Sequence, residues 1–215
     1  MEHEQKLREF TISSVNELGL AAGEFHAEQF IRYLTHLIEW NKVINLTSIT
    51  NPTEIIIKHF IDSLIALVAT SFPQNGVVLD VGSGGGFPGI PLKIMRPDMQ
   101  LVLVEPVLKK CSFLNSVIVL LKLQDVSTFD GTVEQYAKHP LRHAIDMVVI
   151  RALKYEEIRK HIPALLTPKG KIVLYRAEAI KKDEIGNDFH LVSEIDFMLP
   201  QGFGKRVVTV IEKNL

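Results

Sequence analysis

Apolar side chains in the first 73 residues recur at the three- and four-residue spacing of amphipathic helices. This spacing predicts helices over residues 6–20 and 24–45. A third helix is predicted to begin at Asn51-Pro52-Thr53-Glu54, which supplies a cap, a proline at the first helical position and a capping-box glutamate. It is predicted to end before Pro73. The sequence therefore predicts a small helical N-terminal unit over residues 1–73.

From residue 74 onward the pattern changes, because short β-branched and aliphatic runs alternate with helical segments. Strands are expected over residues 77–79, 101–104, near 126, 145–150 and 171–175, and helices over residues 88–95, 107–123 and 155–166. Such alternation is typical of an α/β fold with a doubly wound, mostly parallel sheet. Residues 191–199 and 205–212 are strand-like and closely connected, which predicts a C-terminal antiparallel hairpin. Residues 74–215 are thus predicted to form a second domain.

The composition is that of a globular protein, since 47% of the 215 residues are apolar and 23% are charged. A chain of this length can bury one hydrophobic core and add a smaller unit to it. No stretch reaches the roughly 18 uncharged apolar residues of a membrane span. The charged N-terminus is unlike a secretory signal, and the single cysteine, Cys111, excludes an internal disulfide. We expect a cytoplasmic monomer that needs neither membrane nor metal.

The formal net charge of −1 argues against a protein that coats nucleic acid with its whole surface. Charge is nevertheless uneven along the chain. Residues 1–76 hold 5 Lys and Arg against 9 Asp and Glu, whereas residues 77–215 hold 19 against 16. This distribution permits a local site for a polyanion on the second domain.

The candidate chemistry lies in the sequence VVLDVGSGGGFPGIP, residues 77–91. An apolar strand is followed by Gly82, Gly84, Gly85 and Gly86, and a proline-marked helix start comes next. Glycines at this density suit a backbone that turns sharply or approaches a ligand closely. The segment also satisfies the dinucleotide pattern G-x-G-x-x-G, so its spacing alone leaves two cofactor classes open.

Two acids favour one of these classes. Asp80 ends the first strand beside the loop, where its carboxylate would repel a pyrophosphate but suit the cationic S-adenosylmethionine. Glu105 follows the second strand, at the distance from the loop where an acid usually binds ribose hydroxyls. We therefore expect S-adenosylmethionine as the cofactor. The alternative is an ordinary tight turn with Glu105 as a solvated strand end.

Three motifs together give the chain a family resemblance: Asn45-Leu46-Thr47, His59 with Asp62-Ser63-Leu64, and the glycine loop. Over residues 40–152 the chain resembles the bacterial small-subunit ribosomal RNA guanine-N7 methyltransferases, known as GidB or RsmG. The resemblance implies a class I S-adenosylmethionine-dependent methyltransferase, with a Rossmann-like sheet. It also implies methylation of guanine N7 in the decoding-region loop of 16S ribosomal RNA, either naked or in the 30S particle.

The resemblance also implies roles for particular residues. Arg151 would align the reactants electrostatically and contact the cofactor, although a surface ion pair is the alternative. The other residues implied to hold the cofactor are Asp80, Gly82, Gly84, Phe87, Glu105, Val133 and Glu134. The candidates for RNA contact are His59, Lys110 and Arg176.

Each of these candidates also has a structural interpretation. His59 fits a hydrogen-bonded histidine on a helix packing face, with Asp62 as its partner. Lys110 and Glu134 fit solvated side chains near helix starts. The chain departs from the family at Thr132, where an arginine is frequent, and at Tyr175-Arg176-Ala177, where a lysine-glycine pair is frequent.

The implied chemistry needs no general base, because guanine N7 attacks with a lone pair that bears no proton. Accordingly, the chain lacks the Asp/Asn-Pro-Pro-aromatic run that grips an exocyclic amine, and no proline adjoins Cys111 as in cytosine-5 enzymes. Two other functions stay open at this stage: a nicotinamide-dependent oxidoreductase and a non-catalytic RNA-binding assembly module.

Overall fold

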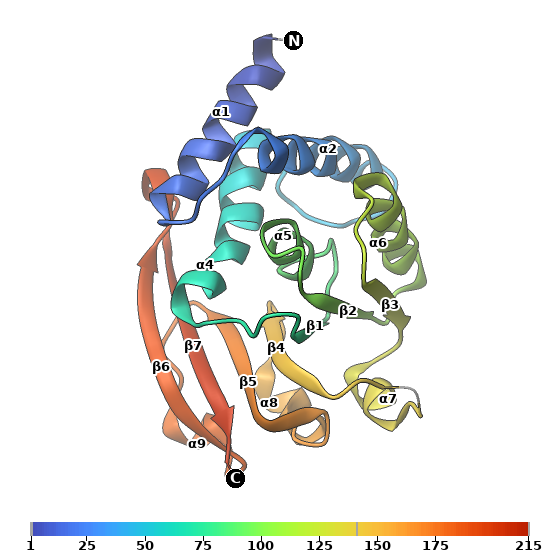
Figure 1. The fold of residues 1–215 in the computed structure, drawn as a ribbon, viewed down its shortest axis with the longest axis vertical. Helices are drawn as coiled ribbons and strands as arrows, with labels where there is room; N and C mark the ends of the chain where they lie inside the picture. Colours follow the sequence, from blue (N-terminus) through green and yellow to red (C-terminus); the bar gives the residue numbers. More distant parts are fainter. Residues whose placement is uncertain (1, 141, 215) are drawn as a thin grey trace.

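The computed structural model describes residues 2–140 and 142–214. Within them lies a seven-stranded sheet with the order β3-β2-β1-β4-β5-β7-β6 (Figure 1). The strands are β1 (Val77–Val81), β2 (Gln100–Glu105), β3 (Val126–Asp130), β4 (Ile145–Arg151), β5 (Leu166–Arg176), β6 (Phe189–Met198) and β7 (Lys205–Lys213). Strands β1 to β5 pair in parallel, and β7 pairs antiparallel with both β5 and β6. The predicted α/β fold with a C-terminal hairpin is confirmed.

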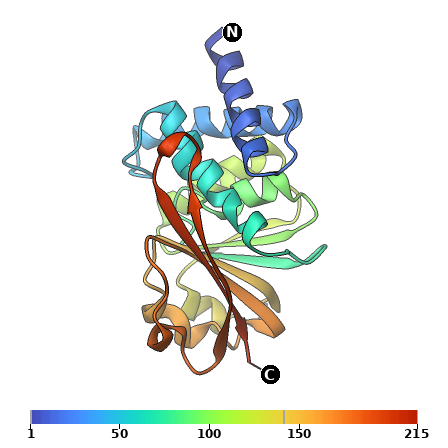
Figure 2. The same ribbon diagram turned by 90° about the vertical axis from the view of Figure 1, so that its left-hand side faces the viewer.

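Helices cover both faces of the sheet (Figures 1 and 2). They are α1 (Glu2–Glu17), α2 (Glu24–Asn41), α3 (Pro52–Ile55), α4 (Asp62–Ala69), α5 (Gly89–Met95), α6 (Leu108–Leu121), α7 (Val133–Lys138), α8 (Tyr155–Ile158) and α9 (Lys182–Ile185). Helices α2, α4, α5 and α6 lie on one face, and α7, α8 and α9 lie on the other. Adjacent residues of β1 point to opposite faces. Val78 therefore packs in one core cluster and Leu79 in the other.

The N-terminal helices are packed on the sheet rather than held apart from it. Phe30 of α2 and Phe60, which follows α3, are fully buried in the same cluster as Val78 and Leu103. Between α3 and α4 the chain forms a π-helical turn, η1 (Ile56–Ile61). The predicted cap is present, since the Asn51 side chain accepts a hydrogen bond from the Glu54 amide at 3.1 Å. The division into units of residues 1–73 and 74–215 stays a prediction.

Two predicted helices are shorter in the structure. The helix expected over residues 24–45 ends at Asn41, whose side chain accepts hydrogen bonds from the backbone of Leu46 and Thr47. The helix expected over residues 155–166 is reduced to α8 and one 3-10 turn, η2 (Arg159–His161). Pro163 explains the second difference, because it lacks the backbone N–H donor that a continuing helix requires.

Strand β5 also begins earlier than predicted. It starts at Leu166, which pairs with Ile145, and the next pair is Lys171 with Met147. The residues expected to form a turn, 167–170, lie within this register shift between β4 and β5. A tight turn and a bulge share the same proline and glycine signals, so local sequence could not separate them. Across residues 2–140 and 142–214, no helix is long and apolar enough to cross a membrane.

Candidate active site

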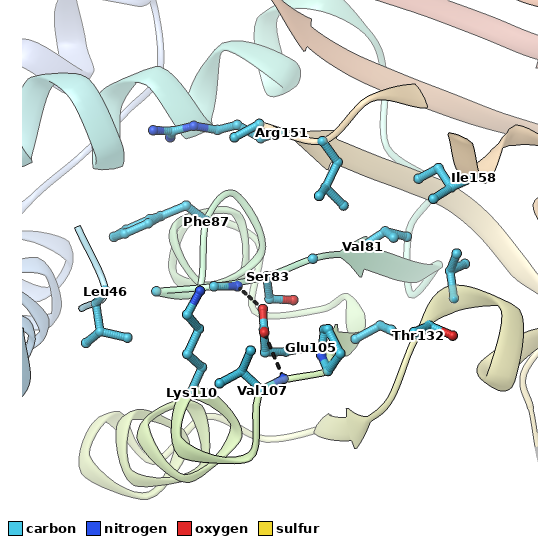
Figure 3. Close-up of a pocket in the computed structure, with 18 of the residues that line it drawn as sticks. Leu46, Val81, Ser83, Phe87, Glu105, Val107, Lys110, Thr132, Arg151 and Ile158 are labelled. Carbon is cyan, nitrogen blue, oxygen red and sulfur yellow. Dashed lines mark hydrogen bonds between the residues drawn. The ribbon is translucent and has the colours of Figure 1, made fainter. Parts of the chain in front are cut away.

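A cavity of about 560 Å³ lies at the carboxyl ends of β1, β2 and β4. Open α/β sheets place their ligands at this edge. The cavity brings together residues far apart in sequence, from the glycine loop, the end of β2 and the segment after β4 (Figure 3). The predicted site residues among its lining are His59, Gly82, Gly84, Phe87, Glu105, Lys110, Val133 and Arg151.

The glycine loop presents bare backbone to this cavity. Gly82 has φ +73°, and a Cβ atom there would lie 2.4 Å from Leu153 Cδ1. Gly84 has φ +56°, and a Cβ atom there would meet nothing closer than the Gly82 carbonyl oxygen at 3.8 Å. Both backbone conformations favour glycine. The open space at Gly84 is what a closely approaching ligand requires.

Glu105 joins the loop to the next segment of the cavity wall. One of its carboxylate oxygens accepts a hydrogen bond from the Gly84 amide at 2.8 Å, and the other accepts from the Val107 amide at 3.0 Å (Figure 3). Its side chain is nearly buried, and it lines the cavity. Each carboxylate oxygen has a further lone pair. Glu105 can therefore accept ligand hydroxyls while it holds the backbone.

Asp80 does not line the cavity, which corrects the expectation that its charge faces the cofactor. Its carboxylate is fully buried and accepts a hydrogen bond from the Gly89 amide at 2.9 Å. Burial raises the pKa of Asp80 to about 7, although the Gly89 hydrogen bond acts in the opposite direction. Asp80 fixes the first turn of α5 from below, and Glu105 is the carboxylate that reaches the ligand space.

The Arg151 guanidinium is held by the π-helical turn η1 and the start of α4. Its Nη2 donates to the Lys58 carbonyl at 2.9 Å and to His59 Nδ1 at 2.8 Å. Its Nη1 donates to the His59 carbonyl at 3.2 Å and to Ser63 Oγ at 3.3 Å. Asp62 lies 3.4 Å from Nη1. Arg151 is thus a fixed cation in the cavity wall, not a solvated surface ion pair.

His59 occupies a packed and hydrogen-bonded position. Its ring stacks on Phe87 with centroids 4.6 Å apart, and its Nε2 lies 2.6 Å from Thr47 Oγ1. Burial, reinforced by the Arg151 charge, lowers the pKa of His59 to about 3. The imidazole is therefore neutral at physiological pH. Asp62, expected as its partner, instead accepts a hydrogen bond from Arg206 at 2.9 Å.

Besides Asp80, two more predicted site residues lie outside the cavity lining. The Glu134 side chain is exposed and forms an ion pair with Lys138 at 2.7 Å, while its neighbour Val133 does line the cavity. Arg176 forms an ion pair with Glu184 at 2.6 Å. Neither side chain contacts the cavity, so any role of Glu134 at this site would come from backbone near Val133.

Sequence reasoning missed Tyr33 of α2. Its hydroxyl donates to the carbonyl of Gly85 within the loop, and its ring packs 5.7 Å from that of Phe87. In the sequence, Tyr33 is one member of an amphipathic stripe and gives no signal that separates it from ordinary core residues. Leu46 and Leu153 also line the cavity, and only the folded structure reveals this.

Comparison with known proteins agrees with this geometry. Residues 26–197 match the family model described as GidB, rRNA small subunit methyltransferase G. The "Ribosomal RNA small subunit methyltransferase G" of Desulfitobacterium hafniense is 38% identical over 185 residues, which cover 86% of this chain and 75% of that protein. The protein of the same name from Staphylococcus epidermidis is 32% identical over 214 residues, covering 96% of this chain and 90% of that one.

Among solved structures, TYW2 of M. jannaschii in complex with AdoMet superposes with a TM-score of 0.52 at 20% sequence identity. The superposition covers 70% of this chain and 74% of that one. The architecture is therefore that of the class I S-adenosylmethionine-dependent methyltransferases, as the sequence predicted. The family model matches most of this chain, and a relative that is 32% identical in sequence covers 96% of it. The chain therefore belongs to the rRNA small subunit methyltransferase G family.

Proposed function

We propose that this protein transfers a methyl group from S-adenosylmethionine to N7 of a guanine in the decoding-region loop of 16S ribosomal RNA. The observation that carries the proposal is the use of the loop amides. Gly84 and Gly89 donate their backbone N–H groups to the carboxylates of Glu105 and Asp80. A pyrophosphate binds through free amides at a loop and helix start. These two amides are therefore not free to bind a pyrophosphate, and the Glu105 carboxylate in the cavity lining favours a cationic ligand.

The residues of the cavity fit S-adenosylmethionine. Glu105 would accept hydrogen bonds from the ribose hydroxyls, and the backbone near Val133 would face the adenine edge. The open backbone at Gly82 and Gly84 would allow the methionine portion to lie along the loop, with Phe87 packed against it. A cavity of about 560 Å³ is within the usual range of roughly 300 to 1,000 Å³ for such ligands.

When bound, the cofactor supplies a methyl group on a positively charged sulfur. Guanine N7 would accept this methyl group through a lone pair that bears no proton, with the sulfur leaving as a neutral thioether, so no proton would have to move. The chain then needs only to align the two reactants and exclude water. Arg151, immobilised in the cavity wall, is suited to orientation, and Lys110 in the lining is suited to contact with RNA phosphate.

A methyl-transfer assay tests the proposal. The protein is incubated with radiolabelled S-adenosylmethionine and with 30S subunits or naked 16S ribosomal RNA that lack the modification. Label should appear at N7 of one guanine in the decoding region, and comparison of the two substrates shows which form is used. Label on another base, on protein or on a small molecule would refute the proposed substrate.

Cofactor choice is tested separately by thermal shift. Binding of S-adenosylmethionine at about 100 times its dissociation constant should stabilise the protein by about 2.7 kcal/mol, whereas NAD should have no effect. Gly84→Val should abolish the shift because its side chain would fill the open space. Gly19→Val is the matched control, since Gly19 also has a positive φ of +77° and a Cβ atom there meets nothing within 4 Å, but it follows α1 and does not line the cavity. Stabilisation by NAD would favour an oxidoreductase, and failure of both ligands would favour a non-catalytic RNA-binding module.

A further inference from the structure

A continuous line of side-chain hydrogen bonds runs from the N-terminal helices to the cavity. Asn41, at the end of α2, donates through Nδ2 to the Thr47 carbonyl at 2.8 Å and accepts from the Thr47 amide at 3.0 Å. Thr47 Oγ1 lies 2.6 Å from His59 Nε2, and His59 Nδ1 lies 2.8 Å from Arg151 Nη2. His59 and Arg151 are 92 positions apart in the sequence. The line therefore links two separate parts of the chain.

The direction of each hydrogen bond follows from the chemistry of the groups. A guanidinium nitrogen can only donate, so His59 Nδ1 must be an unprotonated acceptor. The proton of the neutral ring is then on Nε2, which donates to Thr47 Oγ1. Thr47 Oγ1 also accepts from the Ile49 amide at 3.1 Å. Arg151 thus selects the tautomer of His59, and Thr47 Oγ1 holds the opposite ring nitrogen as an acceptor.

The same contacts immobilise Arg151. Its two terminal nitrogens make four hydrogen bonds, to the Lys58 and His59 carbonyls, His59 Nδ1 and Ser63 Oγ. The guanidinium carbon lies 5.7 Å from the centre of the Phe87 ring. Only the Nε–H group lacks a hydrogen-bond partner within the described part of the chain. A guanidinium has five N–H donors in a rigid plane, so fixing four of them fixes the direction of the fifth.

We infer that His59 is a positioning residue for methyl transfer: it holds Arg151 in the cavity wall, and Thr47 holds the other side of the imidazole ring. The inference rests on the proposed function and deepens it. Direct contact of His59 with RNA is disfavoured, because both ring nitrogens are already paired and one ring face is covered by Phe87. The segment from Thr47 to Ser63 thereby contributes to the catalytic site through Arg151.

Two near-isosteric substitutions separate the functions of the two ring nitrogens. In His59→Asn, the side-chain amide of the asparagine lies near the former Nδ1 position, and its oxygen can accept the hydrogen bond from Arg151. In His59→Gln, the side-chain amide of the glutamine lies near the former Nε2 position. It keeps the contact with Thr47 but offers no acceptor to Arg151. We expect His59→Gln to lower kcat about 10- to 100-fold, the usual effect of small misplacements at a reacting centre. His59→Asn should retain a larger part of kcat, and Thr47→Val should give an intermediate loss.

The decisive measurement is a double-mutant cycle on kcat at saturating cofactor and RNA. If His59 acts through Arg151, the variant with both His59→Gln and Arg151→Lys should be no slower than Arg151→Lys alone. Additive losses, or a His59→Gln variant with unchanged kcat, would overturn the inference. The inference would also be overturned if the wild-type pH profile of kcat showed an ionisation that is lost in His59→Asn. Such a loss would show that His59 titrates during catalysis.

The wild-type protein in the same assay separates this inference from the proposed function. If the wild type methylates guanine N7, the proposed function stands, and the variants then test the role of His59. Absence of methyl transfer by the wild type would refute both. Thermal melts of every variant show whether a lost rate reflects lost folding, and a folded His59→Gln variant with lowered kcat is the supporting result.

Discussion

Replacing Glu105 by glutamine tests how the glycine loop is held. In the protein, one carboxylate accepts backbone hydrogen bonds from Gly84 at 2.8 Å and from Val107 at 3.0 Å. Glutamine keeps one acceptor oxygen but turns the other position into an NH₂ donor. Whichever way the amide is oriented, one backbone N–H group then faces another donor. The Glu105→Gln variant should therefore lose one of the two contacts completely.

The expected magnitude follows from burial. Glu105 is 4% exposed, so water cannot easily replace the missing acceptor. A hydrogen bond to a charged group contributes about 1.5 to 3 kcal/mol, and an unsatisfied buried donor costs a similar amount. We expect a loss of about 2 kcal/mol in the free energy of unfolding. For a chain of this size the melting temperature should fall by roughly 4 to 8 °C.

Cofactor binding gives an independent readout of the same substitution. A carboxylate that accepts ribose hydroxyls binds them more strongly than an amide, so the dissociation constant for S-adenosylmethionine should rise by about 10-fold, or about 1.4 kcal/mol. Glu105→Ala should weaken binding further, by about 1.5 to 3 kcal/mol. Thermal melts without ligand and isothermal titration calorimetry with ligand measure the two effects separately.

Glu134→Gln is the matched control, because Glu134 is an exposed acid beside the cavity lining and pairs only with surface groups. It should change neither the melting temperature nor the affinity. An unchanged melting temperature in Glu105→Gln would refute the inferred support of the loop. Lowered stability with unchanged affinity would show that the ribose is bound elsewhere.

Three further substitutions test the buried polar groups. Asp80→Asn should gain stability over the wild type as pH rises from 4 to 7, by up to about 1.4 kcal/mol per unit, because ionising the buried carboxyl, with its pKa of about 7, costs stability. Tyr33→Phe should lower the free energy of unfolding by about 1 to 3 kcal/mol, since it leaves the Gly85 carbonyl unpaired. Asp62→Ala should cost about 3 to 5 kcal/mol, because the Arg206 and Arg151 charges lose their buried partner.

Denaturant titrations measure all three effects. For Asp80→Asn, a difference from the wild type that does not vary between pH 4 and 7 would contradict the raised pKa; above pH 8 the difference should be constant. A Tyr33→Phe variant as stable as the wild type would show that the hydrogen bond to the loop contributes nothing net. An Asp62→Ala variant within 0.5 kcal/mol of the wild type, the range of ordinary surface changes, would refute the buried ion-pair interpretation.

Much of the fold and part of the site follow from local sequence. The apolar runs at β1 and β2 specify buried strands, and glycines at Gly82 and Gly84 are required where the backbone has positive φ and a ligand space opens. Glu105 could be assigned to the cavity because it ends a strand whose carboxyl end must lie at the ligand edge of a parallel sheet. These features depend on neighbours within a few residues.

Only the tertiary structure decided which polar groups meet. The pairing of Arg151 with His59, and that of Tyr33 with Gly85, join segments 92 and 52 positions apart. The sequence also could not show that Asp80 points into the core while Glu105 points into the cavity, although both are acids at strand ends. Such contacts depend on how the helices pack across the sheet. That packing is set by the fit of many buried side chains together, and no local pattern encodes it.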